Sequence, residues 1–298
     1  MAKARRGMTL LESLIVIVVI MFLISQALPA IQRVRGAADR TSCQNNLRQI
    51  GQALHLYHGD HGRFPPAPPL VDRFMPERQL SWLALLLPYI DQKPLYDQSV
   101  QACAISGNPM QVPPHVGAIT VIRLYVCPTD SRLLAARKDD WGTLAAFGSY
   151  LAASGGYSRV GKGYAGTLPG RSLAEVRDGP SYTVCVGERP PPDSGQGGWW
   201  YPNIAFDTRG HRGPNAELVL GTVMPYLPFD PQCSLTYRST GPGRTTNPCD
   251  RFHFWSLHGG GGNFLFVDGS VRFLAYSVDP ILPDLISIDG GEMVTLPD

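Results

Sequence analysis

The hydrophobic pattern opens with one long uncharged stretch near the N-terminus. Residues 13–32 carry no charged side chain and contain the run LIVIVVIMFLI. A helix of about 20 residues rises about 30 Å, which is the thickness of the hydrocarbon core of a bilayer. In lipid this run must be helical despite its β-branched residues, because only a helix satisfies its own backbone groups there. The stretch therefore predicts a transmembrane helix.

Apolar residues keep recurring at helical spacing beyond Pro29, which predicts an amphipathic continuation. We expect one long helix over about Thr9–His58, bent at Pro29, with two separate helices as the alternative. Residues 8–32 would form its transmembrane half, and residues 33–62 an amphipathic half that packs on an outer domain. The apolar positions that recur after Pro29 are Ile31, Val34, Ala38, Leu47, Ile50, Leu54 and Tyr57.

Residues 63–298 are expected to form the outer globular domain. An apolar segment at Ser81–Ile90 predicts a short helix, and several strand-like runs separated by turn residues follow it. Regular helix–strand alternation is missing, which disfavours a doubly wound parallel sheet. The expected class is α+β, with the long helix packed on a mainly antiparallel sheet with long loops. The predicted strands are Ile119–Val126, Ser181–Val186, Ala216–Val223, Asn263–Val267 and Ser270–Tyr276.

The last two runs predict a C-terminal hairpin. Asp268 and Gly269 stand between them, and an Asp-Gly pair supplies the two positive-φ positions of a type I′ turn. Since side chains alternate along a strand, Phe264 and Phe266 should face one side of the sheet and the residues between them the other.

The composition of the chain restricts the classes of binding partner and the cellular compartment that we expect for it. A net charge of +2, from 26 basic and 24 acidic residues, gives no reason to propose nucleic acid as a partner. The six cysteines all follow the apolar stretch, and none forms a CxxC pair. Disulfides on the outer side of a membrane are therefore favoured over zinc binding, with buried thiols in a reducing compartment as the alternative.

Three interpretations compete for the N-terminus. A cleaved signal peptide fits the basic start, but Ala27–Ala30 lacks a clean small-x-small cleavage site. A plain single-pass anchor explains the length but not Glu12, a carboxylate directly against the apolar run, where charge is costly. The third interpretation rests on Arg5–Glu12, RRGMTLLE, which resembles the class III signal of type IV prepilins and pseudopilins.

This resemblance implies processing and a pilin-like fold. In that family a membrane peptidase cuts after the glycine, here Gly7, so that residues 1–7 would be the leader peptide. The new N-terminal residue, here Met8 where Phe is usual, is then methylated. The glutamate at mature position five, here Glu12, is thought to pair with the free amine of a neighbouring subunit, and a paired carboxylate and ammonium are tolerable in lipid.

A second resemblance spans nearly the whole chain. His258 is followed by four glycines and, after nine residues in all, by Asp268 and Gly269. This spacing is similar to that of a large bacterial family, domain of unknown function 1559, whose members also carry prepilin-like N-termini. Further matching segments are Cys43–Leu54, Tyr57–Pro65, Ser81–Trp82, Leu87–Tyr89, Cys127–Asp130, Asp178–Ser181, Val186–Glu188 and His253–His258.

The second resemblance makes two disulfides plausible. Cys233 would pair with Cys249 across a polar loop, and closing a loop of that size contributes about 3 kcal/mol. Cys43 would pair with Cys127 and tie the helix to the sheet. Sequence alone leaves the pairing open, and the remaining cysteines, Cys103 and Cys185, would be free buried thiols.

Metal ligands are the next candidates. His258 and Asp268 could bind a metal. Some pseudopilins hold calcium near their C-terminus, and Asp60, Asp130 or Asp268 could supply its oxygen ligands, but the carboxylates lack EF-hand-like spacing. We expect no resident metal or cofactor. His258 would order the glycine loop by hydrogen bonding and Asp268 would make the turn, while Glu188 is interpreted as part of a loop.

Other motifs are weaker still. His55, His58 and His61 could chelate a metal near the helix end, although solvated histidines are commoner there. The aromatic run Trp199–Tyr201 could stack on sugars or partner proteins, but we expect it to fill the core. The chain has no G-x-S-x-G, HExxH or Walker A motif, and Gly161-Lys-Gly163 is interpreted as a loop rather than a phosphate-binding Rossmann fingerprint. We therefore expect no enzyme, and a hydrolase is the least favoured function.

Two functions are carried forward. The first is a pilin-like or pseudopilin-like subunit, cut by prepilin peptidase and assembled with other pilin-like subunits into a fibre or secretion-related structure. The alternative is a single-pass tethered binding module of the cell envelope. Lys3, Arg5 and Arg6 favour a cytoplasmic N-terminus, and the resemblance supports that orientation, since arginines also follow the apolar run. The expected location is the inner membrane, with the globular domain periplasmic or extracellular.

Overall fold

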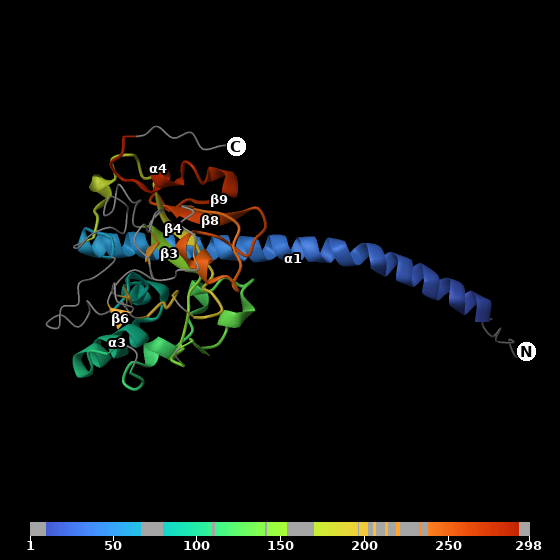
Figure 1. Cartoon of the computed structure of the whole chain (residues 1–298), viewed down its shortest axis with the longest axis horizontal. Coiled ribbons are helices and arrows are strands. Elements are labelled where there is room, and N and C mark those ends of the chain that lie inside the picture. The colour runs from blue at the N-terminus through green and yellow to red at the C-terminus, as the bar shows by residue number, and fades with distance from the viewer. Residues whose placement is uncertain are drawn as a thin grey trace, which may run out of the picture.

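The chain has an α+β fold, with one long N-terminal helix, several short helices and mainly antiparallel sheets. This is the fold class expected from the sequence. Figure 1 shows the computed structural model, in which the long helix α1 enters and crosses the globular part of the molecule. The structure describes residues 10–66, 80–108, 111–140, 142–153, 170–195, 197–201, 205–206, 212–213, 219–220, 233 and 238–291.

Helix α1 is continuous over Leu10–His61, a length of 52 residues, with Pro29 inside it. The alternative of two separate helices is therefore wrong, and the helix ends three residues beyond His58. Gly62 follows at φ +69°, and its N–H donates to the carbonyl of His58. A glycine in this left-handed conformation is a common helix stop, because it closes the last turn without a Cβ penalty.

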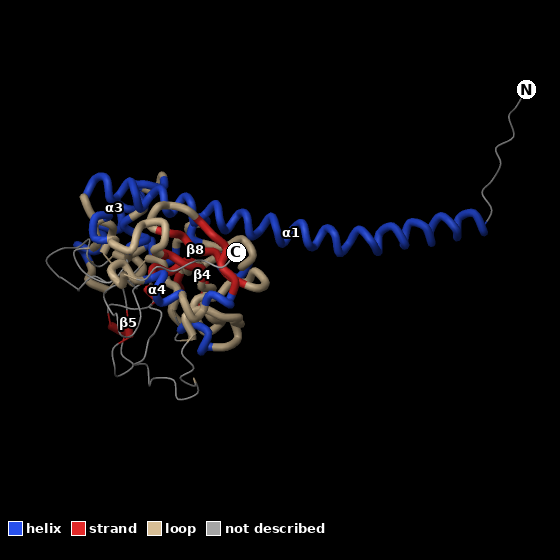
Figure 2. The backbone as a smooth tube through the Cα atoms, turned by 90° about the horizontal axis from the view of Figure 1, so that it is seen from above, coloured by secondary structure: helices blue, strands red, loops and turns tan. Residues whose placement is uncertain are grey.

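The first half of α1 projects from the globular part as a stem, defined here as residues 10–38 (Figures 1 and 2). The large apolar side chains from Leu14 to Val34 are exposed. Ile31 and Val34 are among them, at 62% and 69% exposure, so packing of the amphipathic half does not begin at residue 33 as expected. The guanidinium of Arg40 lies over the ring of Phe273, and Cys43 is the first fully buried residue of the helix.

The main sheet has five strands in the order β7-β3-β4-β8-β9, and α1 contacts β8 and β9. All neighbouring pairs are antiparallel except β3 and β7. The strands are β3 Tyr150–Ala153, β4 Val184–Glu188, β7 Val219–Leu220, β8 Gly261–Phe266 and β9 Val271–Ala275, and two small ladders pair β1 Arg137–Lys138 with β2 Leu144–Ala145 and β5 Ala205–Phe206 with β6 Arg212–Gly213.

The predicted C-terminal hairpin is present as β8 and β9, but its turn differs from the expected type. Gly269 has φ +86°, whereas Asp268 is not among the residues with positive φ. The Gly269 N–H donates to the Phe266 carbonyl, and the Phe266 N–H donates to Ser270. The connection is thus a three-residue loop with glycine at its left-handed position, which needs one positive φ rather than two.

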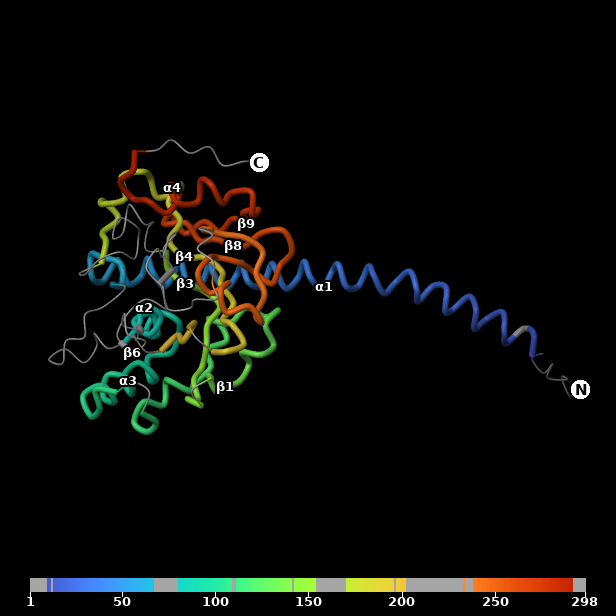
Figure 3. Tube along the Cα trace, viewed as in Figure 1, coloured from blue at the N-terminus to red at the C-terminus, as the bar shows by residue number. Residues whose placement is uncertain are grey.

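The two faces of the sheet pack into different cores. Leu265 and Val267 lie in the core that contains the buried face of α1, while Phe264 and Phe266 lie in the core on the opposite face beside α4 Leu282–Ile286. The alternation predicted for β8 is therefore correct. In Figure 3, α4 lies above the sheet and helices α2 and α3 lie on the other side of α1.

One of the predicted strands is helical in the structure. The run Ile119–Val126 forms turns of 3-10 helix, because Ile122 and Tyr125 enter the core while the backbone winds around them. The short helices are α2 Trp82–Leu85, η2 Leu87–Ile90, α3 Lys93–Ile105, η3 Val116–Ile119, η4 Arg123–Tyr125, η5 Ser131–Leu133, η7 Leu173–Glu175, η8 Pro248–Phe252 and η9 Tyr276–Val278.

Candidate functional site

The stem is the first candidate site, because it presents an unusually long apolar surface. In the part of the chain that the structure describes, α1 is the one helix long and apolar enough to cross a bilayer. Glu12 lies within the first turns of α1. Gly7 and Met8, the expected processing residues, lie outside the described residues.

Two disulfides fix the outer domain. Cys43 of α1 is bonded to Cys127, 84 residues away, and Cys233 is bonded to Cys249, 16 residues away. These are the pairs that the family resemblance implies. The other two cysteines are buried free thiols. Burial raises the pKa of Cys103 to about 11 and raises that of Cys185 further, so neither is a reactive thiolate at neutral pH.

A buried polar cluster surrounds the Cys43–Cys127 bond. Cys43, Cys127, Glu188 and His258 each offer one possible ligand atom, and these atoms all lie within 4.8 Å of one another. His258 Nε2 is 3.5 Å from Cys127 Sγ and 3.7 Å from Glu188 Oε1. We call these four residues the Cys–Glu–His cluster. It is the one such group among the described residues that could hold a metal ion.

Four separate elements bring the cluster together. Cys43 lies on α1, Cys127 follows η4, Glu188 ends β4, and His258 precedes β8. All four side chains are buried, with exposures of 8% or less. Their sequence positions are far apart, so the cluster exists only once the helix has docked on the sheet.

A chain of amides orients the carboxylate. Asn263 on β8 donates from its backbone N–H to Glu188 Oε2 at 2.8 Å and from Nδ2 to Glu188 Oε1 at 2.9 Å. Gln44 on α1 donates in turn to Asn263 Oδ1 at 3.0 Å. The carboxylate is thus held in one orientation by neutral donors. Burial lowers the pKa of His258, although the neighbouring Glu188 opposes that shift, so the imidazole is favoured in its neutral form.

The sequence did not predict this cluster. Glu188 was interpreted as loop, because a proline-rich segment follows it, but it is the last residue of β4 and is 2% exposed. His258 is expected to order the glycine loop, and the structure adds that its Nε2 faces Cys127 and Glu188. The sequence contains one indication of the cluster. Cys43, Cys127 and His258 all lie in segments that resemble the same family.

The carboxylates considered for calcium have other partners. Asp60 accepts a hydrogen bond from the Tyr89 hydroxyl, and Asp130 forms an ion pair with Arg132. Asp268 accepts from the Ser270 N–H at 2.8 Å and so makes the turn, as expected. None of the three belongs to the cluster around His258.

Histidines at the end of α1 also have local roles. The Tyr57 ring stacks on His61 at a centroid distance of 4.0 Å, and His58 Nε2 accepts from the Leu173 N–H. His55 packs edge-on against Phe64. The aromatic run Trp199–Tyr201 is fully buried, as expected for core residues.

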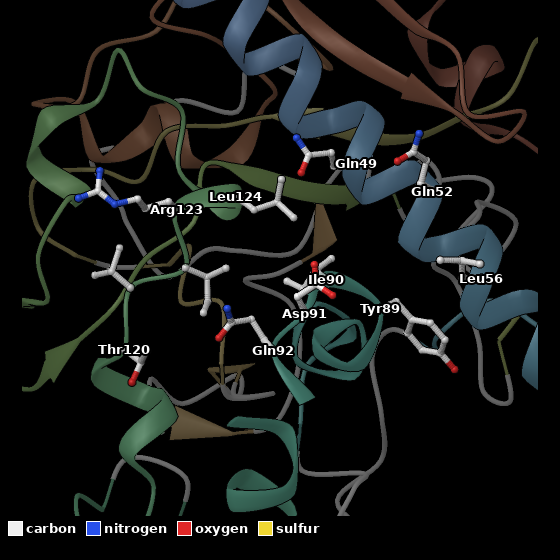
Figure 4. Close-up of a pocket in the computed structure, with 12 residues that line it drawn as sticks. Gln49, Gln52, Leu56, Tyr89, Ile90, Asp91, Gln92, Thr120, Arg123 and Leu124 are labelled. Carbon is white, nitrogen blue, oxygen red and sulfur yellow. The ribbon is translucent and has the colours of Figure 1, made fainter. Parts of the chain in front are cut away.

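A surface pocket of about 590 Å³ lies beside the buried half of α1. Figure 4 shows Gln49, Gln52 and Leu56 on successive turns along one side of α1, which faces the η2 and η4 segments. Burial and the neighbouring Asp60 raise the pKa of Tyr89, at the rim, to about 12. Amide and hydroxyl groups dominate its polar lining, which consists of Gln49, Gln52, Tyr89, Asp91, Gln92, Thr120 and Arg123.

Comparison with known proteins places the chain in a family. Searches among curated proteins and among solved structures found no match. A family profile described as protein of unknown function (DUF1559) matches residues 32–281, which covers most of the chain and contains the whole Cys–Glu–His cluster. The chain therefore belongs to the DUF1559 family.

Proposed function

We propose that this chain is a type IV prepilin-like protein of the cell envelope. The observation that carries the proposal is the stem, whose large apolar side chains are exposed from Leu14 to Val34. So long an apolar surface is unfavourable in water, so lipid or neighbouring helices must cover it. The segment Arg5–Glu12 directly precedes the apolar run and selects a prepilin over a plain anchor.

Processing would prepare the stem for assembly. A prepilin peptidase with methyltransferase activity would cut after Gly7 and methylate Met8. The new amine would then lie one helical turn from Glu12 and pair with that carboxylate on a neighbouring subunit, since either charge alone is costly in the bilayer.

Assembly would replace lipid contacts of the stem with contacts between stems. The folded part would remain outside the membrane, periplasmic or extracellular, because disulfides persist in an oxidising compartment. Cys43–Cys127 ties the helix to the sheet at the point where the stem ends, so that a pull on the stem is transmitted to the whole domain.

Intact-mass analysis of the native protein tests the processing. We expect a chain that begins at an N-methylated Met8. In the Gly7→Ala variant the leader should remain attached, whereas Gly36→Ala, on the exposed part of α1 with open space around it, should be processed normally. Residues 1–7 still present in cells with an active prepilin peptidase would leave only a tethered protein.

Replacing Glu12 by Ala tests the assembly. We expect membrane retention with loss of cross-linked stem oligomers, because the subunit can no longer pair with a neighbour's amine. Gln32→Ala is the matched control, since Gln32 is an exposed polar residue on the same helix. Unchanged cross-linking in Glu12→Ala would contradict assembly and favour the alternative.

That alternative is a tethered binding module, and the 590 Å³ pocket is the observation that favours it. Its amides and Tyr89 suit a polar polymer of the envelope, such as a glycan. Gln52→Ala and Gln92→Ala should then weaken retention of the protein on isolated cell-wall material, while leaving stem cross-linking unchanged.

A further inference from the structure

We propose that the Cys–Glu–His cluster binds a zinc-class divalent cation when the Cys43–Cys127 disulfide is reduced. His258 Nε2 lies 3.5 Å from Cys127 Sγ and 3.7 Å from Glu188 Oε1. The second distance is too long for a direct hydrogen bond. Neighbouring ligand atoms of a tetrahedral zinc ion are about 3.3–3.8 Å apart, given zinc–sulfur and zinc–nitrogen bonds of about 2.3 and 2.0 Å.

The chemistry of the donor set also suits such an ion. Two thiolates, an imidazole and a carboxylate together form a four-ligand set of the kind that holds structural zinc. The four side chains are at most 8% exposed, so little room is left for a water ligand. The site would therefore be a closed, structural centre rather than a catalytic one.

Outer contacts hold the ligands ready. Asn263 fixes both oxygens of Glu188, and Gln44 fixes Asn263. Ser149 Oγ accepts from the Cys127 N–H at 3.0 Å. Such contacts orient metal ligands and strengthen binding, and here they hold the buried Glu188 carboxylate in one orientation toward the cluster.

Metal binding at this site would depend on the redox state of the Cys43–Cys127 disulfide. A dithiol reductant would give two electrons and two protons to the Cys43–Cys127 bond, so that the reductant becomes a disulfide and both cysteines become thiols. Zinc would then displace the two thiol protons and form two zinc–sulfur bonds. Reoxidation of the pair by a small-molecule disulfide, which takes up the two electrons and leaves as two thiolates, would release the ion, because a disulfide sulfur is not a thiolate ligand. Gly259 and Gly260, which follow His258 directly, are exposed.

Zinc titration of the full-length protein in detergent micelles tests the proposal. The protein is reduced with a phosphine, desalted under argon and mixed with Zn²⁺ alone, and bound zinc is measured by elemental analysis. We expect one ion per reduced chain and none per oxidised chain. The Cys233→Ser/Cys249→Ser variant removes the other disulfide and should still bind one ion, whereas Cys43→Ser/Cys127→Ser should bind none.

A second measurement separates the folded site from loose thiols. Cobalt(II) bound to thiolates gives a charge-transfer band, and its intensity reports the cysteine ligands directly. Glu188→Gln keeps all thiols but removes one ligand, so its affinity should fall about tenfold or more. Zinc or cobalt binding that survives unchanged in Glu188→Gln, or equal binding by oxidised protein, would overturn the proposal even if the cysteine variants unfold.

Discussion

At the scale of single residues, the interior of the outer domain depends on buried polar side chains with specific partners. His115 is fully buried, with Nδ1 2.9 Å from the Tyr201 hydroxyl and Nε2 2.9 Å from the Ser106 carbonyl. Only a neutral imidazole can accept from one partner and donate to the other. This hydrogen-bond pair therefore anchors the end of α3 to the aromatic core.

This arrangement predicts a pH dependence of stability. Burial lowers the pKa of His115, so the unfolded chain binds a proton more readily than the folded one. The stabilisation is complete above the unfolded pKa of about 6.5 and is lost as the pH falls through the lower, folded value. We expect the free energy of unfolding to decrease between pH 7 and pH 5, measured by urea denaturation.

Substitution isolates this contribution. In His115→Gln the decrease should be shallower than in the wild type, although His253, whose pKa burial also lowers, still contributes. A slope that is identical in wild type and His115→Gln would show that His115 is not responsible.

The glycine run that leads into β8 and includes its first residue gives a second residue-scale prediction. A Cβ at Gly261 would lie 2.9 Å from Ala275 Cα and still closer to the Leu274 carbonyl oxygen, and both are backbone atoms that cannot move aside. Gly261→Ala should cost about 1–3 kcal/mol of unfolding free energy. Gly259→Ala, where no atom lies within 4 Å, should be near neutral. Equal stability of the two variants would contradict this account.

The burial of single residues could be predicted from the sequence where the neighbouring residues in the chain determine it. The Trp199–Tyr201 run was expected in the core because three consecutive large aromatics can bury a large apolar area. Glu188 was missed because a proline-rich segment begins two residues after it, and because its burial depends on amides from β8 and α1 that are distant in sequence. Partners of that kind cannot be read from a single segment.

At the scale of elements, the two halves of α1 differ in what covers their apolar side chains. Ile50 is fully buried on the sheet, whereas Ile31 is 62% exposed on the stem. Ile50→Ala should destabilise the domain by about 2–5 kcal/mol, because it leaves a cavity. Ile31→Ala is the same change on the same helix and should shift unfolding by less than about 0.5 kcal/mol. Thermal unfolding in detergent, followed by tryptophan fluorescence, measures both.

Sequence predicted the elements that carry strong periodicity and missed those set by packing. The helix and the hairpin follow from spacing and turn residues, and their boundaries are close to those observed. The run Ile119–Val126 has the composition of a strand, but Tyr125 donates to the Leu83 carbonyl from a 3-10 turn. A β-rich segment pairs as a strand only where a neighbouring strand is free to receive it.

At the scale of the whole molecule, the stem and the folded part are structurally independent. The packed half of α1 contacts the sheet from about Arg40 onward, and the Cys43–Cys127 bond lies just beyond that point. The stem adds exposed apolar surface but no described core residue. Stability of the globular part should therefore not depend on the stem.

Deletion of residues 1–36 tests this independence. The shortened chain should remain soluble without detergent, because the exposed apolar run is gone, and should keep both disulfides. Its unfolding free energy should match that of the full-length protein in micelles within about 0.5 kcal/mol, since no buried contact is removed. A markedly less stable fragment would mean that the stem folds back on the domain, and that covering its apolar surface does not require lipid or other subunits.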